Sequence, residues 1–165
     1  MWKTSHIIPI PKKTHPKIPN DYRPVALTSI AMKSLERIIK TFLLKETEHQ
    51  LDKWQFAYRA KKGVDDALLT ILHNTYMHLD KTNAYVRLLF LDFSSAFNTI
   101  QPYLLLSKLK NMKVNSNLIL WIDSFMLRRP QYVRVNESDS SVILTSTGAP
   151  QGCVISPNPI HTLHK

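Results

Sequence analysis

One stretch of the sequence leaves the chain few ways to fold. Residues 85–93 are almost all apolar and carry an acid, Asp92, in the last position but one. A short apolar run of this composition is typical of a strand that is buried on both faces of a sheet. We therefore predict a buried central strand over 85–93, with Asp92 at its carboxyl end.

Helices are predicted on both sides of this strand, because apolar residues recur at helical spacing in four segments. The first helix has Thr28 or Ser29 available as its cap. The second is expected to direct its apolar residues inward, namely Leu68, Ile71, Leu72 and Leu79. The predicted helices cover residues 31–50, 65–79, 102–112 and 116–127.

Other segments predict extended chain. The first 27 residues are rich in proline and in basic side chains, and prolines at this density exclude a helix. Two short strands, 131–136 and 141–145, flank a polar turn and indicate a hairpin. The mixture of helices, a hairpin and a central strand predicts a single domain of the α+β class.

The charge of the chain narrows the class of partner. The 165 residues include 22 Lys and Arg against 12 Asp and Glu, a net charge of +10. This balance favours a polyanionic partner, nucleic acid before a membrane surface. The single cysteine, Cys153, allows no internal disulfide, and no apolar stretch is long enough to cross a membrane. No targeting signal is visible, so we expect an intracellular protein of the cytoplasm or nucleus.

Asp92 is the first candidate for chemistry. A carboxylate at the point where a buried strand emerges is costly unless something compensates its charge. A metal ion would do so, and so would a turn whose backbone N–H groups the carboxylate caps. Phe97, taken alone, is a core residue. The adjacent acids Asp65 and Asp66 are assigned to the first turn of a helix, where the helix dipole favours negative charge.

Two further segments could bind a ligand. Residues 148–157 contain two of the three glycines and two prolines. They form a constrained loop that could approach a ligand closely or could simply reverse the chain. Arg23 has a planar guanidinium that suits phosphate, and Lys12 and Lys13 precede it. The alternative for these cations is a solvated basic surface.

In their order and spacing these segments resemble the reverse transcriptase domain of non-LTR (LINE-type) retrotransposons. The resemblance covers residues 2–157, nearly the whole chain. A single motif of this kind is weak, whereas five in the family's order are specific. The matching motifs are residues 22–25 and 55–59 in the fingers, 92–100 and 150–157 in the palm, and 129–135 between the palm motifs.

The resemblance implies a partial right-hand polymerase with fingers and an incomplete palm and without a thumb. Residues 1–84 would be mainly fingers, 85–157 would carry the palm motifs, and 158–165 would be a divergent tail. It also implies an RNA template, a DNA primer and deoxynucleoside triphosphates as partners. The implied reaction is RNA-directed DNA synthesis by two-metal phosphoryl transfer with Mg²⁺.

The first palm motif implies roles for three residues. Asp92 matches the first palm carboxylate, which would hold Mg²⁺ together with the backbone carbonyl of Phe93. Phe97 matches the aromatic gate beneath the incoming sugar, where its bulk would exclude a 2′-hydroxyl. Hard oxygen ligands of this kind are the ones that Mg²⁺ prefers.

The second palm motif and the fingers imply the remaining contacts. Gln151 and Gly152 would line the nucleotide and template side of the pocket. Arg23 would contact the incoming triphosphate, with Lys12 or Lys13 as a helper. Cations around a triphosphate agree with its charge.

The sequence departs from the family near its end. The family's third palm motif, a Tyr-x-Asp-Asp hairpin, is missing, and the chain ends eight residues after Pro157. With one carboxylate of three, two-metal chemistry loses charge stabilisation, so we expect no polymerase activity from this chain alone. Strands that normally pair with 85–93 would also be missing, so we expect poor solubility.

Three hypotheses therefore remain for the function. The first is a truncated polymerase domain. The second is a non-catalytic remnant that binds nucleic acid, in which case salt-dependent binding would be indifferent to Asp92→Ala. The third is an inert genomic relic, of which little folded protein should exist in cells.

Overall fold

The computed structural model describes residues 2–92 and 97–155 of the chain. The backbone carbonyl of Phe93 and residues 156–165, with the Ser-Pro of the second palm motif and the tail, lie outside the described residues. The chain divides into two compact units. The larger unit is Met1–His49 with Ser95–Lys165, and the smaller unit is Gln50–Ser94.

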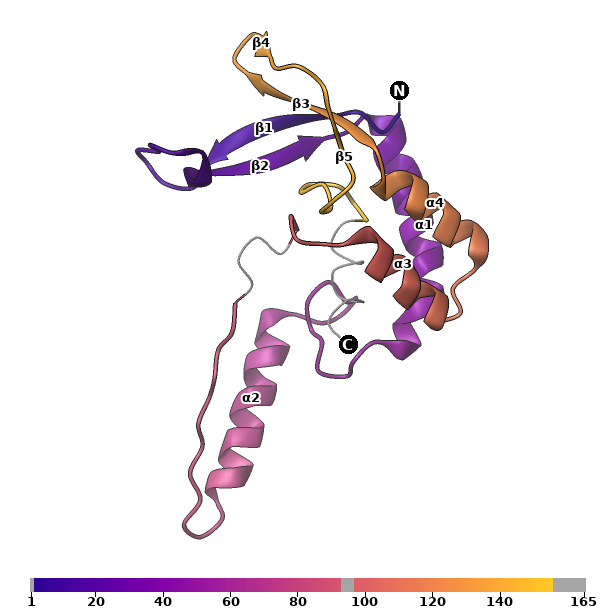
Figure 1. The fold of residues 1–165 in the computed structure, drawn as a ribbon. Coiled ribbons are helices and arrows are strands. Elements are labelled where there is room, and N and C mark those ends of the chain that lie inside the picture. The colour runs from indigo at the N-terminus through magenta and orange to yellow at the C-terminus, as the bar shows by residue number, and fades with distance from the viewer. Residues whose placement is uncertain (1, 93–96, 156–165) are drawn as a thin grey trace. The chain divides into compact units, whose positions relative to one another are not determined.

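The larger unit contains a five-stranded mixed sheet (Figure 1). Its strands are β1 (Ser5–Pro11), β2 (Tyr22–Leu27), β3 (Arg129–Val135), β4 (Ser138–Asp139) and β5 (Ile143–Thr145). The spatial order is β2-β1-β3-β4, with β5 also paired to β3. β1 pairs with β2 antiparallel and with β3 parallel, so strands from the two ends of the sequence lie side by side.

Prolines fit into this sheet because of where their missing N–H groups point. Pro9 and Pro24 lie opposite each other in the β1–β2 ladder. The N–H of Ala26 points away from β1, since it donates to Gln151 O at 2.6 Å, and Pro24, two residues earlier, faces the same way. Pro9 lies beyond the residues of β1 that pair with β3, Ser5 to Ile7. Neither proline therefore removes a ladder hydrogen bond. The strands β1 and β2 confirm the extended conformation predicted for the first 27 residues.

The predicted hairpin is confirmed, with a longer first strand. β3 begins at Arg129, two residues before the predicted start, and the short strand β4 interrupts the turn. β5 pairs with the beginning of β3 and β4 with its end. Arg134 and Asp139 join that end through two hydrogen bonds of 2.7 Å.

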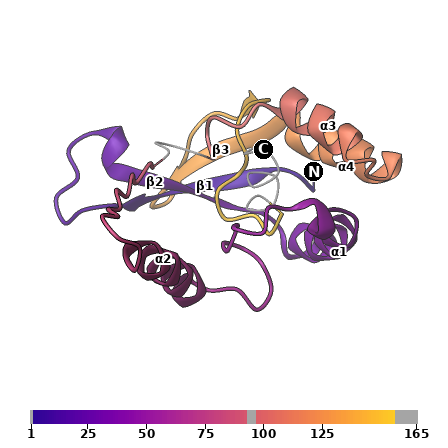
Figure 2. The ribbon, with the colours of Figure 1, turned by 90° about the horizontal axis from the view of Figure 1, so that it is seen from below.

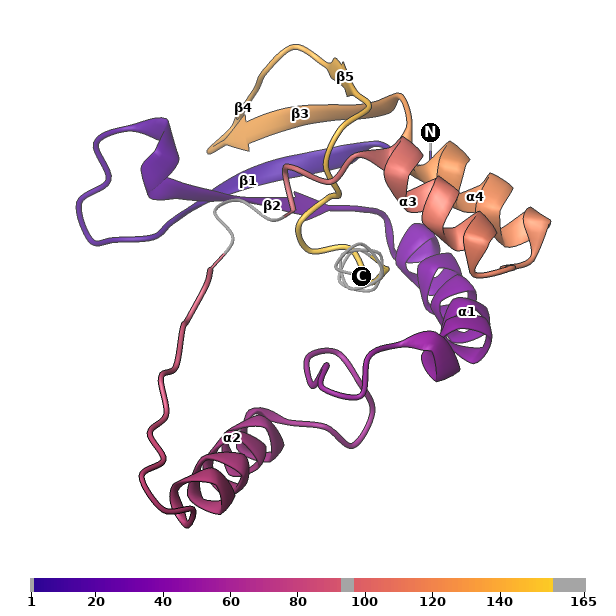
Figure 3. The ribbon, with the colours of Figure 1, turned by 60° about the horizontal axis from the view of Figure 1, so that its bottom comes forward.

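Three helices of the larger unit lie together beside the sheet, as Figures 2 and 3 show. They are α1 (Ile30–Thr47), α3 (Pro102–Asn111) and α4 (Ser116–Met126), close to the predicted bounds. Ser29 caps α1, since its hydroxyl accepts the N–H of Met32 at 3.2 Å. At the other end of α1 the Glu46 carboxylate accepts the N–H of Asn115 at 2.7 Å, which ties α1 to the start of α4.

The core of the larger unit lies where these helices meet residues 149–155. Phe97 packs against this core, and Cys153 is buried within it, as predicted for both. Burying one aliphatic side chain in this core contributes about 1.5–3 kcal/mol to the free energy of unfolding. The most deeply buried apolar side chains are Leu43, Leu105, Leu109, Ile122, Met126 and Ile155.

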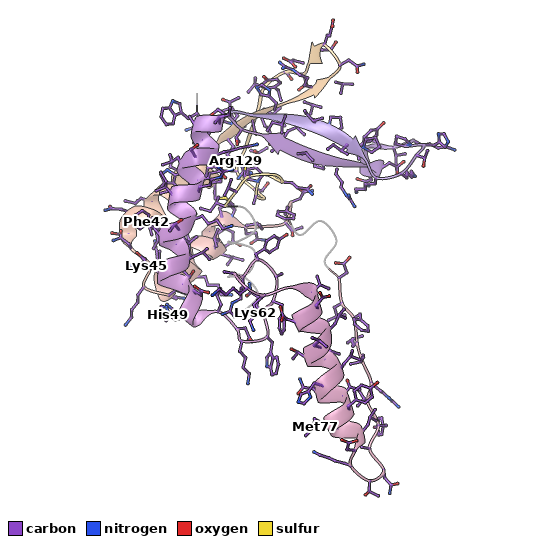
Figure 4. All side chains as sticks on the ribbon, turned by 180° about the vertical axis from the view of Figure 1, so that it is seen from behind. Phe42, Lys45, His49, Lys62, Met77 and Arg129 are labelled. Carbon is purple, nitrogen blue, oxygen red and sulfur yellow. The ribbon has the colours of Figure 1, made fainter. Side chains whose placement is uncertain are left out.

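The smaller unit contains α2 (Val64–Leu79). The Asp66 carboxylate accepts the N–H of Gly63 at 2.7 Å, which agrees with the assignment of this acid to the helix start. The prediction that the apolar residues of α2 point inward is wrong, because no residue of α2 is buried. Met77, near the carboxyl end of α2, is an example of an exposed apolar residue in this helix (Figure 4). The helical spacing of apolar residues depends only on neighbouring positions in the sequence, whereas burial of a helix face needs another element to pack against it.

The predicted buried strand over 85–93 is also wrong for the residues that the structure describes. Residues 84–92 form no strand, and Leu89, Phe90 and Leu91 are each 80–81% exposed. Apolar composition makes burial favourable but cannot supply the neighbouring strands that a ladder requires. No described strand pairs with this segment.

The helices and the mixed sheet confirm the α+β class. None of the helices in the described ranges combines the length and the hydropathy needed to cross a membrane.

Candidate functional site

After β5 the chain runs back across one face of the sheet (Figures 1 and 3). Gly148 and Gly152 make this course possible, with φ of +67° and +106°. A Cβ at Gly148 would lie 3.0 Å from the carbonyl oxygen of Phe97, and one at Gly152 would lie 3.0 Å from that of Ala26. The glycines are therefore needed for close approach to the protein's own backbone.

Backbone hydrogen bonds join this loop, residues 148–155, to two other motif segments. The N–H of Ala149 donates to Phe97 O at 2.7 Å, and the N–H of Gly148 donates to Ile100 O at 2.8 Å. The N–H of Ala26 in β2 donates to Gln151 O. The structure thus brings together the described parts of the two palm motifs and β2, the strand that contains the finger motif 22–25.

Arg129 holds the beginning of the loop. Its buried guanidinium donates to the carbonyl oxygens of Thr147 at 2.8 Å, Gly148 at 3.0 Å and Met126 at 3.0 Å. Burial lowers the pKa of Arg129. Figure 4 shows this residue, which begins β3. The sequence places Arg129 in a motif but does not predict that its guanidinium binds the loop. The one signal is its position in front of a proline, where a strand begins.

A cavity of about 360 Å³ lies between the sheet and the loop. That volume is in the usual range for small-molecule sites. Its walls are partly apolar, with Ile7 and Val133, and partly polar, with Thr145 and Thr147. Four of the motif segments contribute to it, through Pro24, Asn98, Arg129 with Gln131, and Pro150 with Gln151.

The predicted site residues of the larger unit are only partly brought together. Gln151 lines the cavity, whereas Gly152 is exposed and lies against Ala26. Phe97 is half-buried against the core. Arg23 is exposed and precedes Pro24, which lines the cavity; successive side chains of a strand point to opposite faces, so Arg23 faces the other side. Its contact with a triphosphate stays a prediction.

Lys12 and Lys13 have partners in the connection between β1 and β2. Lys12 Nζ donates to Asn20 O at 2.8 Å. Lys13 Nζ lies 2.8 Å from the carboxylate of Asp21, and this contact, with the N–H of Lys17, lowers the pKa of Asp21. Both lysines remain exposed, so a helper role toward a phosphate stays a prediction as well.

Asp92 belongs to the smaller unit, where it is exposed at the end of the 84–92 segment. In the described ranges no group of three or more His, Cys, Asp or Glu side chains could hold a metal ion. Mg²⁺ takes near-octahedral coordination, often with several waters. The described side chains therefore do not form a complete magnesium site, and the role of Asp92 as a metal ligand stays a prediction.

Comparison with known proteins identifies the class. The family described as "Reverse transcriptase (RNA-dependent DNA polymerase)" matches residues 10–162. The chain belongs to this reverse transcriptase family.

Two relatives, both from Drosophila melanogaster, narrow the class further. The RNA-directed DNA polymerase from mobile element jockey is 32% identical over 161 residues. The probable RNA-directed DNA polymerase from transposon BS is 28% identical over 159 residues. Each alignment covers 94% of this chain and 17% of the relative, so the chain spans about a sixth of their length. The resemblance to reverse transcriptase domains of non-LTR retrotransposons is confirmed.

Proposed function

We propose that this chain is part of the polymerase region of a non-LTR retrotransposon reverse transcriptase and binds the RNA template and DNA primer. One observation carries the proposal: residues from four family motif segments line one cavity, beside a loop held by a buried arginine. The net charge of +10 supports a polyanionic partner. In a right-hand architecture residues 1–84 would be mainly fingers and 85–157 would carry the palm motifs.

Individual roles follow from the motifs. Gln151 and Gly152 contact the template and the incoming nucleotide, and Phe97 stands beneath its sugar. Arg23 contacts the triphosphate, with Lys12 or Lys13 as helper. These assignments are supported for Gln151 by its place in the cavity wall.

The metal site of the proposal is incomplete. Asp92 would supply one carboxylate and Phe93 its backbone carbonyl as ligands, and Mg²⁺ would neutralise charge on the triphosphate. Two-metal transfer needs further oxygen ligands that the described side chains do not provide. The proposal therefore assigns binding to this chain, and no turnover in isolation.

Binding is tested with a labelled RNA–DNA primer–template and fluorescence anisotropy across a range of salt. The logarithm of the affinity should fall linearly with the logarithm of the salt concentration. Gln151→Ala should weaken binding by about tenfold, the effect of one lost polar contact of ~1.4 kcal/mol. Asn117→Ala, which removes an exposed amide from α4, is the matched control. Equal affinities for the two variants would contradict the assignment of Gln151.

The net charge also suits a second candidate, a remnant that binds nucleic acid without any metal role. Asp92→Ala separates the two candidates. A metal ligand predicts that Mg²⁺ tightens nucleotide binding by the wild-type chain and not by the variant. A remnant predicts the same salt-dependent affinity for both proteins, with and without Mg²⁺.

A further inference from the structure

A buried carboxylate that lies outside the proposed binding site is bonded to the loop that forms part of it. Glu36 of α1 is 0% exposed. It lies on the same face of the helix as Met32 and Leu43, both of them core residues. An apolar side chain is expected at such a position, since a buried carboxylate is costly unless it is hydrogen-bonded.

The hydrogen bonds of Glu36 run to the end of the 148–155 loop. Its Oε2 accepts the N–H of Val154 at 2.7 Å and that of Ile155 at 3.2 Å, across more than a hundred residues of sequence. Hydrogen bonds to an ionised acceptor are stronger than those between neutral groups. Two successive backbone groups are thus fixed in direction by one oxygen atom.

Glu36 and Arg129 hold opposite ends of the same loop. Arg129 binds the carbonyl oxygens of Thr147 and Gly148 at its beginning, and Glu36 binds the N–H groups at its end. Gln151 and Gly152 lie between these two anchors. At the same end of the loop, the N–H of Cys153 makes a long hydrogen bond of 3.4 Å to Pro150 O.

The carboxylate at this position also has an energetic cost. In the described part of the chain, Glu36 Oε1 is buried without a hydrogen-bond partner. An apolar residue of similar volume would leave no unpaired oxygen, but it would leave the N–H groups of Val154 and Ile155 without their acceptor. What the carboxylate adds is a fixed direction for the backbone that follows Gly152.

We propose that Glu36 is a positioning residue, whose carboxylate fixes the end of the 148–155 loop and so determines where Gln151 and Gly152 lie. The inference rests on the proposed function of that loop in template and nucleotide binding. Glu36 itself contacts neither ligand; it acts through the backbone of Val154 and Ile155.

The test compares two carboxylates of α1 that have the same type of bond. Glu36→Met removes the acceptor of Val154 and Ile155, and Glu46→Met removes the acceptor of Asn115, away from the loop. Amide hydrogen exchange of the full chain is measured by NMR. Glu36→Met should speed exchange of Val154 and Ile155 by at least about tenfold, whereas Glu46→Met should do so only near Asn115.

Two further variants extend this test. Glu36→Gln keeps an oxygen that can accept both N–H groups, so it should restore slow exchange. Glu36→Asp keeps the charge but withdraws the oxygen, and it replaces Glu36→Met if that variant does not fold. Binding of a labelled RNA–DNA primer–template is measured for each variant, and it should weaken in Glu36→Met or Glu36→Asp and recover in Glu36→Gln.

The outcomes separate this inference from the proposed function. Unchanged exchange of Val154 and Ile155 in Glu36→Met overturns the positioning role. Faster exchange with the affinity of the wild type overturns it too, because the loop would then not need to be held for binding. A wild-type chain that binds no primer–template overturns the proposed function, and the exchange rates still decide whether Glu36 holds the loop.

Discussion

The 148–155 loop and the 84–92 segment both contain residues of palm motifs, yet the protein holds them in opposite ways. The loop contains two glycines, one proline and Gln151, and it is hydrogen-bonded to β2, to α1, to Arg129 and to the backbone of residues 97–100. The 84–92 segment is a short, mostly apolar run, and the structure leaves it exposed and outside any described sheet.

This difference shows that burial follows from available partners rather than from composition. Gly148 and Gly152 let the loop approach other backbone segments closely enough for hydrogen bonds. The apolar run has favourable transfer energy but no described strand to complete its ladder. Substitutions in the two regions should therefore have very different effects on the free energy of unfolding.

The largest effect is expected at Arg129. Arg129→Met keeps most of the volume but leaves three carbonyl oxygens without their donor, which should lower the free energy of unfolding by about 3 kcal/mol. Urea denaturation measures the change. Arg128→Met removes the same charge from the exposed neighbour and should cost less than about 0.5 kcal/mol. Similar losses for the two variants would show that the loop is not held by Arg129.

A smaller effect is expected from a methyl group in the loop. Gly148→Ala puts a Cβ 3.0 Å from the carbonyl oxygen of Phe97 at a φ of +67°, so it should cost about 2 kcal/mol. Gly63→Ala is the control in the smaller unit, where the nearest atom to a new Cβ is 3.6 Å away. This substitution should lower the free energy of unfolding by only ~0.5 kcal/mol. A ranking in the opposite order would contradict the close approach in the loop.

The third prediction concerns pH. Burial raises the pKa of Glu36 above its ordinary value of 4.5, against the lowering effects of the two N–H groups and Lys33. The folded protein then binds more protons than the unfolded chain just above pH 4.5, so the free energy of unfolding should fall as pH rises through that window. The neighbouring Cys153 has its pKa raised to about 12, so its thiol stays neutral there.

Glu36→Gln removes this titration and should flatten that part of the pH profile. Urea denaturation at several pH values, for the wild type and the variant, measures it. Asp21 and Asp139 have lowered pKa values, so their contributions are lost only at more acidic pH. Parallel profiles for the two proteins would mean that Glu36 is not buried as a carboxylate.

The smallest effect is expected in the apolar run. Leu89→Ser and Phe90→Ser change side chains that are 80–81% exposed, so each should alter the free energy of unfolding by less than about 0.5 kcal/mol. Leu105→Ala, in a fully buried position, should cost about 3 kcal/mol as the contrast. Sedimentation velocity should also show less self-association for the serine variants. A loss above ~1 kcal/mol would show that the run is buried after all.

The sequence predicts local features of this fold well. The helices over 31–50, 102–112 and 116–127 are found near their predicted bounds, because period and capping are properties of neighbouring residues. The strand predicted over 85–93 fails because a ladder depends on residues far away in the chain. The prediction for α2 fails for the same reason: the helix is present, but the expected burial of its apolar residues is wrong.

The candidate site is predictable to a similar degree. The loop around Gln151 could be found from its glycines and prolines, whose conformational demands are visible in the sequence. Glu36 and Arg129 could not, because what gives them a role is the backbone of distant segments. The one available signal for Glu36 was an acid on the core face of a predicted helix, between Met32 and Leu43. The roles of Asp92 and Arg23 stay predictions.

The prolines of the sheet have a consequence for oligomer growth. The outward-facing groups of β2 are Tyr22, Pro24 and Ala26, which alternate with the groups that face β1. The N–H of Tyr22 donates to Pro19 O, that of Ala26 donates to Gln151 O, and Pro24 has none. A strand from a second copy would meet no free N–H donor at these three residues, which disfavours extension of the sheet through β2. The exposed leucines of residues 88–91 offer a different, apolar surface for self-association.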